Sequence, residues 1–106
     1  MTDWELAKRI ADVASEEKAV DVVVLDVREM TVLADYFVIA SGRSTIQVKM
    51  IAENIEDILL EEGYRALRRE GFNEGRWIVL DYGSVIVHVF RQQEREYYQL
   101  EKLWAS

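Results

Sequence analysis

Cysteine and proline are both absent from this chain of 106 residues, and histidine occurs once, as His88. The lack of cysteine excludes disulfides and thiolate metal sites. A single histidine without any cysteine also leaves a zinc site short of ligands. We therefore expect no metal and no cofactor, and no turn of the chain is made by proline.

Long hydrophobic runs are missing as well. No stretch of about 18 apolar residues occurs, so we expect nothing to span a membrane. The start of the chain, 1–5, carries acidic residues and lacks the apolar centre of a signal peptide. These features favour the cytoplasm, or an organelle after removal of a transit segment. The length predicts one domain, 1–106, with one core and no deep cleft between domains.

Basic residues are outnumbered, because 13 Lys and Arg face 20 Asp and Glu for a net charge of −7. Phosphate backbones are bound by basic surfaces, so direct recognition of nucleic acid is not expected. A basic protein is a better partner, since opposite fields speed encounter. Acidity also keeps proteins soluble, and the charge alone does not decide between these two interpretations.

Hydrophobic periodicity divides the chain into helices and strands in the order αββαβββα. The run 21–27 is continuous and rich in β-branched residues, which predicts a strand buried on both faces. Thr2 with Glu5, and Ser44 with Gln47, have the spacing of capping boxes. We predict an α/β fold in which helices flank a mixed β-sheet. The expected helices span 3–18, 44–62 and 92–104, and the expected strands span 21–27, 36–41, 65–69, 77–82 and 85–90.

A catalytic site can be sketched from acids at strand ends, namely Asp26, Asp35 and Asp81. Carboxylates there could hold magnesium, and the turn 41–44 before a helix could cradle a phosphate, as in a minimal nucleotidyltransferase. However, no two acids stand two apart on one strand, and no glycine-rich loop carries a lysine. The alternative is that Ser44 caps a helix and the acids end strands. We favour that alternative and predict no catalytic residue and no enzyme activity.

The strand 77–82 separates its residues between two faces. Ile78, Leu80 and Tyr82 share the more apolar face, which should meet the helices, and Trp77 shares the other with Asp81. Trp77 is therefore either a surface residue or a core residue. His88 alternates with valines on the next strand, and we expect it to have a structural or interface role.

The last predicted helix, 92–104, has one side that should pack on the sheet. At 100° per residue, Tyr97, Leu100, Leu103 and Trp104 cluster on that side. Tyr98 points away from it and is expected to be exposed. Tyrosine often anchors interfaces, although an exposed tyrosine is common enough to need no explanation.

Four short blocks of sequence stand out along the chain. They are Asp35–Gly42 followed by Ser44 and Gln47-Val48; Gly71 with Trp77–Gly83; Val87–Phe90; and Arg95 with Tyr98 and Leu100–Trp104. In this order and at these distances they resemble the Iojap and ribosomal silencing factor (RsfS) family, and the resemblance reaches from about Glu5 to Trp104. Each block alone is a weak signal, but four in order are a specific one. One position departs from the pattern, because Ser84 stands where many members carry an acid.

This resemblance implies a nucleotidyltransferase-like fold without catalytic acids, and a non-catalytic function. Family members are understood to bind the large ribosomal subunit through its ribosomal protein number fourteen. Docking there sterically prevents the small subunit from joining and represses translation when nutrients are scarce. Organelle relatives act in large-subunit assembly, so a large-subunit assembly factor is the alternative that the resemblance leaves open. The motif match implies that the partner contacts are Trp77 and Tyr98, followed by Asp81, Tyr82 and Glu101.

Oligomeric state is a separate expectation from the residues themselves. The predicted strands are apolar, and only three helices are available to cover them. An uncovered sheet tends to find a partner, and twofold pairs are the commonest solution. We therefore predict a homodimer at high concentration.

Overall fold

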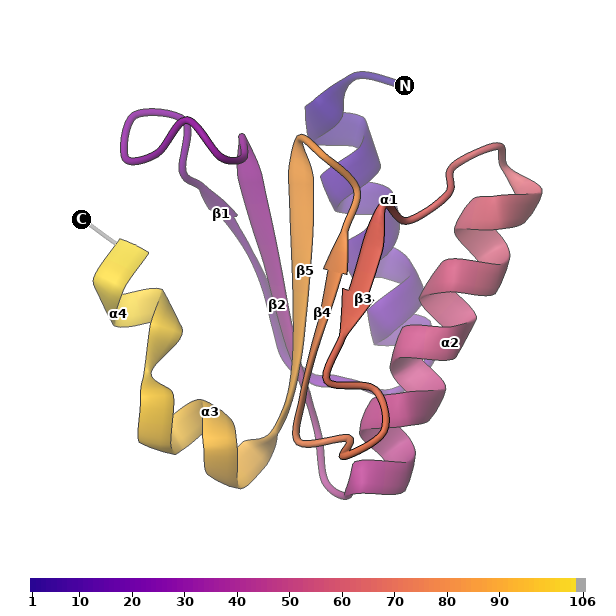
Figure 1. The fold of residues 1–106 in the computed structure, drawn as a ribbon, viewed down its shortest axis with the longest axis vertical. Helices are drawn as coiled ribbons and strands as arrows, with labels where there is room; N and C mark the ends of the chain where they lie inside the picture. Colours follow the sequence, from indigo (N-terminus) through magenta and orange to yellow (C-terminus); the bar gives the residue numbers. More distant parts are fainter. Residues whose placement is uncertain (105–106) are drawn as a thin grey trace.

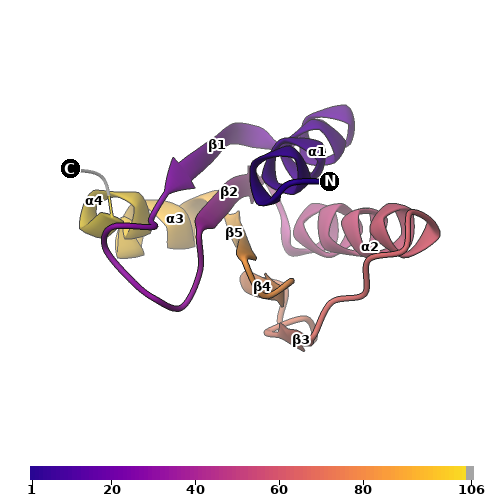
Figure 2. The same ribbon diagram turned by 90° about the horizontal axis from the view of Figure 1, so that it is seen from above.

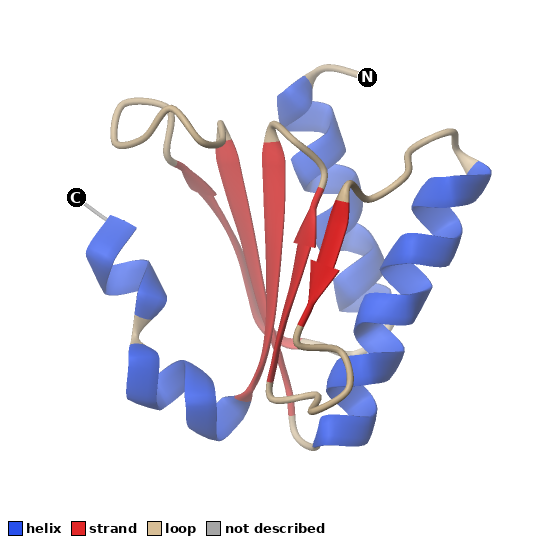
Figure 3. Ribbon diagram, viewed as in Figure 1, coloured by secondary structure: helices blue, strands red, loops and turns tan. Residues whose placement is uncertain are grey.

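The computed structural model describes residues 1–104, and these form a five-stranded sheet flanked by helices (Figures 1 and 3). The predicted α/β order is confirmed, except that the last helix is broken in two. The elements are α1 (Asp3–Glu16), β1 (Val20–Asp26), β2 (Tyr36–Gly42), α2 (Thr45–Glu61), β3 (Arg68–Glu70), β4 (Trp77–Asp81), β5 (Val85–Arg91), α3 (Gln92–Tyr98) and α4 (Leu100–Trp104).

The sheet is mixed, with strand order β1-β2-β5-β4-β3. The central strands β2 and β5 run parallel, and every other neighbouring pair is antiparallel. The predicted hairpin is confirmed: β4 and β5 join through a turn in which the Tyr82 amide donates to the Val85 carbonyl and Gly83 has φ +86°. Glycine reaches that left-handed conformation at little cost.

One face of the sheet is covered by α1 and α2, which lie side by side (Figure 2). We call this the helix face. Its buried side chains are almost all aliphatic. Burial of each large aliphatic side chain contributes roughly 1.5–3 kcal/mol to the stability of the fold. They come from α1 (Leu6, Ala7, Ile10, Val13, Ala14), from α2 (Val48, Ile51, Ala52, Ile55, Leu59) and from the strands (Tyr36, Val38, Ala40, Ile78, Leu80, Val85, Val87, Val89).

The opposite face carries a smaller core. Val27, Ala34, Phe37, Ile39 and Phe90 are buried there, with Leu100, Trp104 and Trp77 packed against them. The short helices α3 and α4 lie beside β1 and β2, whereas β4 and β3 extend away from them (Figure 2). This face, which we call the aromatic face, is therefore only partly covered by helix.

The N-termini of α1 and α2 are capped as the sequence suggests, with one difference. Thr2 Oγ1 accepts from the Glu5 amide at 3.1 Å and Glu5 Oε1 accepts from the Thr2 amide at 2.9 Å, which completes the first capping box. Ser44 Oγ accepts from the Gln47 amide at 3.1 Å. The Gln47 side chain, however, accepts from the Arg43 amide instead of that of Ser44, so the second box was wrong in its reciprocal half.

The expectation that strand 21–27 is buried on both faces was wrong. β1 is an edge strand, and none of its residues is fully buried. Val22 and Val24 pack against the helix-face core and Val23 and Leu25 against the other core, so both faces are apolar but incompletely covered. A continuous apolar run indicates that both faces of a strand pack against other side chains. It does not show whether the strand lies at the centre or at the edge of the sheet.

The prediction of one helix over 92–104 was also wrong. Gln99 adopts a left-handed conformation (φ 49°, ψ 46°), which ends α3 and turns the chain before α4. As a result Tyr97 is 81% exposed and Leu103 is 75% exposed, although both were expected to pack on the sheet. Leu100 and Trp104 do pack there as predicted. The rotation of 100° per residue holds only along an unbroken helix.

Candidate partner-binding surface

The first of the predicted contact residues, Trp77, stands at the start of β4, and a glycine fixes the approach to it. Gly71 has φ +80°, and a Cβ at that position would collide with the carbonyl oxygen of Trp77. The loop 71–75 can therefore lie against the backbone of β4 only because residue 71 has no side chain. This close approach gives a physical reason for the glycine in the second sequence block.

Trp77 belongs to a group of rings on the aromatic face. Its ring lies 4.7 Å from that of Phe90 in a stacked arrangement and 5.0 Å from that of Tyr98. Phe37 joins the group through His88, at 4.9 Å, and through Trp104, at 5.2 Å. Such pairs add about 0.5–1.5 kcal/mol each beyond the area they bury. We call this group the aromatic cluster: Phe37, Trp77, His88, Phe90, Tyr98 and Trp104.

The aromatic cluster is buried at one end and open at the other. Phe90 is fully buried, Trp77 is half-buried and Tyr98 is 50% exposed. Trp77 was expected to be either a core residue or a surface residue, and both expectations are partly right. Its ring stacks on the buried Phe90, but the side chain is only half-buried. Tyr98 is exposed as predicted, but it leans on Trp77 instead of standing free. The structure brings these two residues together at the open end.

His88 lies inside the aromatic cluster and is neutral at physiological pH. Burial lowers the pKa of its imidazole from 6.5 to about 4. The indole Nε1 of Trp77 donates to Nδ1 of His88 at 3.1 Å, whereas Nε2 of His88 has no hydrogen-bond partner among residues 1–104. A structural or interface role was expected for His88, and this contact confirms the structural part.

Glu101 takes part in an ion pair that holds the corner between α3 and α4. Arg95 is 9% exposed, and its guanidinium contacts the Glu101 carboxylate through Nη2 at 2.8 Å and through Nε at 3.2 Å. Its Nη1 donates to Ser41 Oγ at 2.9 Å and to the Val20 carbonyl at 3.3 Å. This interaction lowers the pKa of Glu101. The predicted contact residue Glu101 is therefore also a structural partner of Arg95, a role that the sequence did not reveal.

Asp81 and Tyr82 are not brought together with Trp77 and Tyr98. Asp81 ends β4, about 13 Å along the strand from Trp77, and its carboxylate accepts from the Gly83 amide at 2.8 Å. Tyr82 points to the helix face, as its strand position predicted, and packs there. Its hydroxyl is buried without a partner among the described residues, and burial raises its pKa.

The acids of the sketched catalytic site are each engaged separately. Asp26 accepts from Arg28, whereas Asp81 faces the hairpin turn and Arg68. The neighbouring Asp3 carboxyl raises the pKa of Asp35. No group of three or more potential metal ligands occurs within residues 1–104. Since Ser44 caps α2, the interpretation of strand-ending acids and a helix cap is confirmed.

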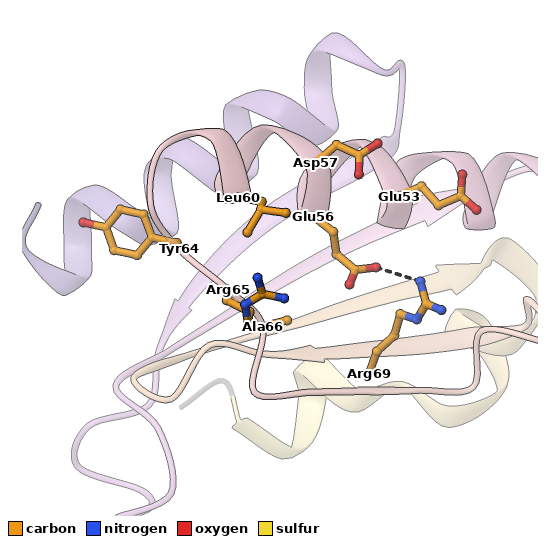
Figure 4. A pocket seen from close by; sticks show the side chains of 8 residues that line it. All are labelled: Glu53, Glu56, Asp57, Leu60, Tyr64, Arg65, Ala66 and Arg69. Carbon is orange, nitrogen blue, oxygen red and sulfur yellow. Dashed lines mark hydrogen bonds and ion pairs between the residues drawn. The ribbon is translucent and has the colours of Figure 1, made fainter.

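A groove between α2 and the segment before β3 was not anticipated from the sequence (Figure 4). Its volume is about 360 Å³, and acids on α2 face two arginines across it. Arg69 pairs with Glu56 at 3.1 Å and stacks on the Phe72 ring. The acidic and basic side chains that line the groove are therefore already partly paired with each other. The lining residues are Glu53, Glu56, Asp57, Leu60, Tyr64, Arg65, Ala66 and Arg69.

Sequence reasoning missed most of the aromatic cluster. Phe37 and Ile39 alternate on β2, and Ile86, His88 and Phe90 alternate on β5, so each set shares one face. Because β2 and β5 pair in register, with Ile39 opposite His88, the two sets lie side by side. The period of two was visible in the sequence, but the pairing of the strands was not.

The family model described as "RsfS: Ribosomal silencing factor during starvation" matches residues 2–106. The ribosomal silencing factor RsfS of Bacillus subtilis is 42% identical over 106 residues, which cover 100% of this chain and 90% of that relative. The chain belongs to the ribosomal silencing factor family. This confirms the resemblance, and with it the expectation of a translation regulator in place of an enzyme.

Plant and structural relatives agree with the family assignment. The chloroplastic protein Iojap of Zea mays is 33% identical over 100 residues, or 94% of this chain and 43% of the plant protein. The crystal structure of a Chromobacterium violaceum protein has a TM-score of 0.96 at 33% identity, covering 100% of this chain and 88% of that one. A second crystal structure, of a protein from Bacillus halodurans, has a TM-score of 0.86 at 39% identity and covers 95% of this chain and 94% of that one.

No helix within residues 1–104 combines the length and the apolar character needed to cross a bilayer.

Proposed function

We propose that this ribosomal silencing factor is a single domain, 1–106, that binds the large ribosomal subunit in the cytoplasm through the open end of its aromatic cluster. The partner implied by the family resemblance is a basic ribosomal protein, number fourteen, on the face that receives the small subunit. A protein docked there blocks subunit joining by occupying space and needs no chemistry of its own. Translation is thereby repressed when nutrients are scarce.

The observation that carries this proposal is the contact between Trp77 and Tyr98. Two aromatic side chains meet at 5.0 Å, one half-buried and the other half-exposed, on a sheet face that helices only partly cover. Interface energy is concentrated in such residues, because they are rigid and expose a large contact area. A tyrosine in contact with a tryptophan is also held in place before binding, which reduces the entropy lost on docking.

Charge supports a basic partner. The net charge of −7 speeds encounter with a basic surface, and salt screens this steering over about 8–10 Å near physiological ionic strength. We expect added salt to weaken binding without abolishing it, because the aromatic contacts remain. Glu101 contributes little to this attraction, because Arg95 already neutralises its charge.

The test is co-sedimentation with purified large subunits, using Tyr98→Ala and Trp77→Ala. Truncation of an interface aromatic commonly costs about 2 kcal/mol, so each change should weaken binding roughly thirtyfold. Tyr98→Ala should leave the melting temperature nearly unchanged, because half of its side chain is in solvent. Trp77→Ala should also lose some stability, since its ring packs on Phe90.

Trp4→Ala is the matched control. Trp4 is about as exposed as Tyr98, but it lies on α1, far from the aromatic face. It should bind large subunits like the unmodified protein. Light scattering of subunit mixtures would then show whether binding prevents joining. A folded Tyr98→Ala protein that binds and blocks joining normally would refute the proposed surface.

Self-association is part of the same proposal. The outer edges of β1 and β3 pair with no other strand among the described residues, and twofold pairing could satisfy one of them. Light scattering at millimolar concentration should detect a dimer. A monomer at that concentration would remove the dimer and leave ribosome binding untouched.

A further inference from the structure

The only polar atom of the Trp77 side chain is used inside the protein. Its indole Nε1 donates to Nδ1 of His88 at 3.1 Å. In the sheet, Trp77 stands opposite Phe90, and His88 lies two residues before Phe90 on the same face of β5. The two side chains are therefore diagonal neighbours across antiparallel strands, within reach of each other.

His88 occupies a position at which a histidine is costly. It is 8% exposed, and its ring lies 4.9 Å from that of Phe37 and 6.2 Å from that of Phe90. Because Nδ1 accepts from the indole, the neutral imidazole carries its proton on Nε2. That N–H is buried without a partner among residues 1–104, which lowers stability. An aliphatic side chain would pack here without this loss, so what histidine adds is its acceptor.

We propose that His88 is a positioning residue for the surface formed by Trp77 and Tyr98. By accepting the indole N–H, it fixes the rotation of the Trp77 ring against Phe90 and Tyr98. Trp77 then presents its ring face and edge to a partner, and no hydrogen-bond donor. The partner group at Trp77 is consequently an aliphatic or cationic side chain, which packs on an aromatic ring, and not a hydrogen-bond acceptor. This inference rests on the proposed function.

The central test compares His88→Leu with His88→Asn in binding to purified large subunits. Leucine fills similar space without an acceptor, whereas Oδ1 of asparagine stands close to the place of Nδ1. We expect His88→Leu to weaken binding about fivefold, which corresponds to the roughly 1 kcal/mol that one hydrogen bond typically contributes. His88→Asn should recover most of that affinity, although it fills less space in the cluster. A role in packing alone predicts the reverse order.

A second background makes the test independent of folding defects. Trp77→Phe has no indole N–H, so adding His88→Leu to it should change binding by less than twofold if the two residues act through this bond. An equal additional loss in the Trp77→Phe background would overturn the proposal, and so would normal binding by His88→Leu alone.

A spectroscopic measurement tests the bond without ribosomes. The indole N–H signals of Trp4, Trp77 and Trp104 are separable by nuclear magnetic resonance, with Trp77→Phe as the assignment control. The Trp77 signal should exchange slowly with water, and it should exchange quickly in His88→Leu. Slow exchange without any binding of large subunits would reject the proposed function while retaining the bond. Fast exchange in the unmodified protein would reject the role of His88 itself.

Discussion

The two faces of the sheet differ in the kinds of side chain they carry and in how completely helices cover them. The helix face is aliphatic, is covered by two long helices and hides nearly all of its side chains. The aromatic face has fewer buried residues, is covered by two short helices and leaves Tyr97, Tyr98 and Leu103 exposed. It also holds the buried Arg95 and His88, whose Nε2 has no hydrogen-bond partner among residues 1–104.

This difference separates stability from recognition. Close-packed aliphatic side chains contribute most to folding stability when every atom is in contact with the protein. The buried side chains of the helix face are therefore not available to bind a partner. Aromatic rings keep contact area and orientation even when one side is left in water. The aromatic face can thus be incompletely covered and still be ordered. The predictions below test this separation, from the largest expected effect to the smallest.

The largest effect is expected on the helix face. Ile51→Ala removes a fully buried side chain of α2 and should cost about 2–5 kcal/mol of folding free energy, measured by urea unfolding. Ile46→Ala, on the exposed side of the same helix, is the control and should change stability by less than about 0.5 kcal/mol. Weaker ribosome binding by Ile51→Ala than its folded fraction explains would show that the faces are not separate.

An acid titration should reveal the buried imidazole of the aromatic face. The pKa of His88 is about 4 when folded and near 6.5 when unfolded, so the unfolded chain takes up the proton first as pH falls. This contribution to stability is complete above pH 6.5 and decreases by about 3 kcal/mol down to pH 4. Urea unfolding should show a shallower pH dependence for His88→Leu over this window. Parallel curves for the two proteins would contradict the assignment.

A smaller effect is expected at the corner between α3 and α4. Glu101→Gln keeps the shape of the side chain but removes the charge that faces Arg95, and should cost about 1 kcal/mol, because solvent screens a partly exposed pair. The pKa of Glu101 is lowered, so its contribution is present above the ordinary value of 4.5 and is lost as pH falls through the lowered value. The difference between the two proteins should therefore vanish in acid. Glu96→Gln, on exposed α3, is the control.

The smallest effect concerns Ser84 at the hairpin tip. Ser84 Oγ donates to Asp3 at 2.8 Å, and the Asp3 carboxyl in turn raises the pKa of Asp35. Ser84→Asp would add a third carboxylate there and slightly lower the melting temperature at neutral pH. The decrease should shrink as the pH is lowered and the acids take up protons. Ser84→Asn, which adds similar bulk without charge, should show no such pH dependence.

Much of the fold was predictable from local patterns. The α2 helix was visible as an apolar stripe between Ser44 and Gly63, and the β4–β5 hairpin as two alternating strands around Gly83. The separation of Ile78 and Leu80 from Trp77 followed from the period of two along a strand. These features depend on near neighbours in the chain, and for that reason they survive without knowledge of the tertiary structure.

The sequence by itself determined the order of elements, the family and the identity of Trp77 and Tyr98 as candidate contacts. Only the tertiary structure decided that β1 lies at an edge, that Gln99 breaks the last helix and leaves Tyr97 exposed, and that the exposed Tyr98 contacts Trp77. One residue in a left-handed conformation, Gln99, changes the direction of the chain, so that Leu103 is exposed although Leu100 and Trp104 still pack on the sheet. The bond from Trp77 to His88 likewise depends on strand register, which links positions that no local periodicity relates.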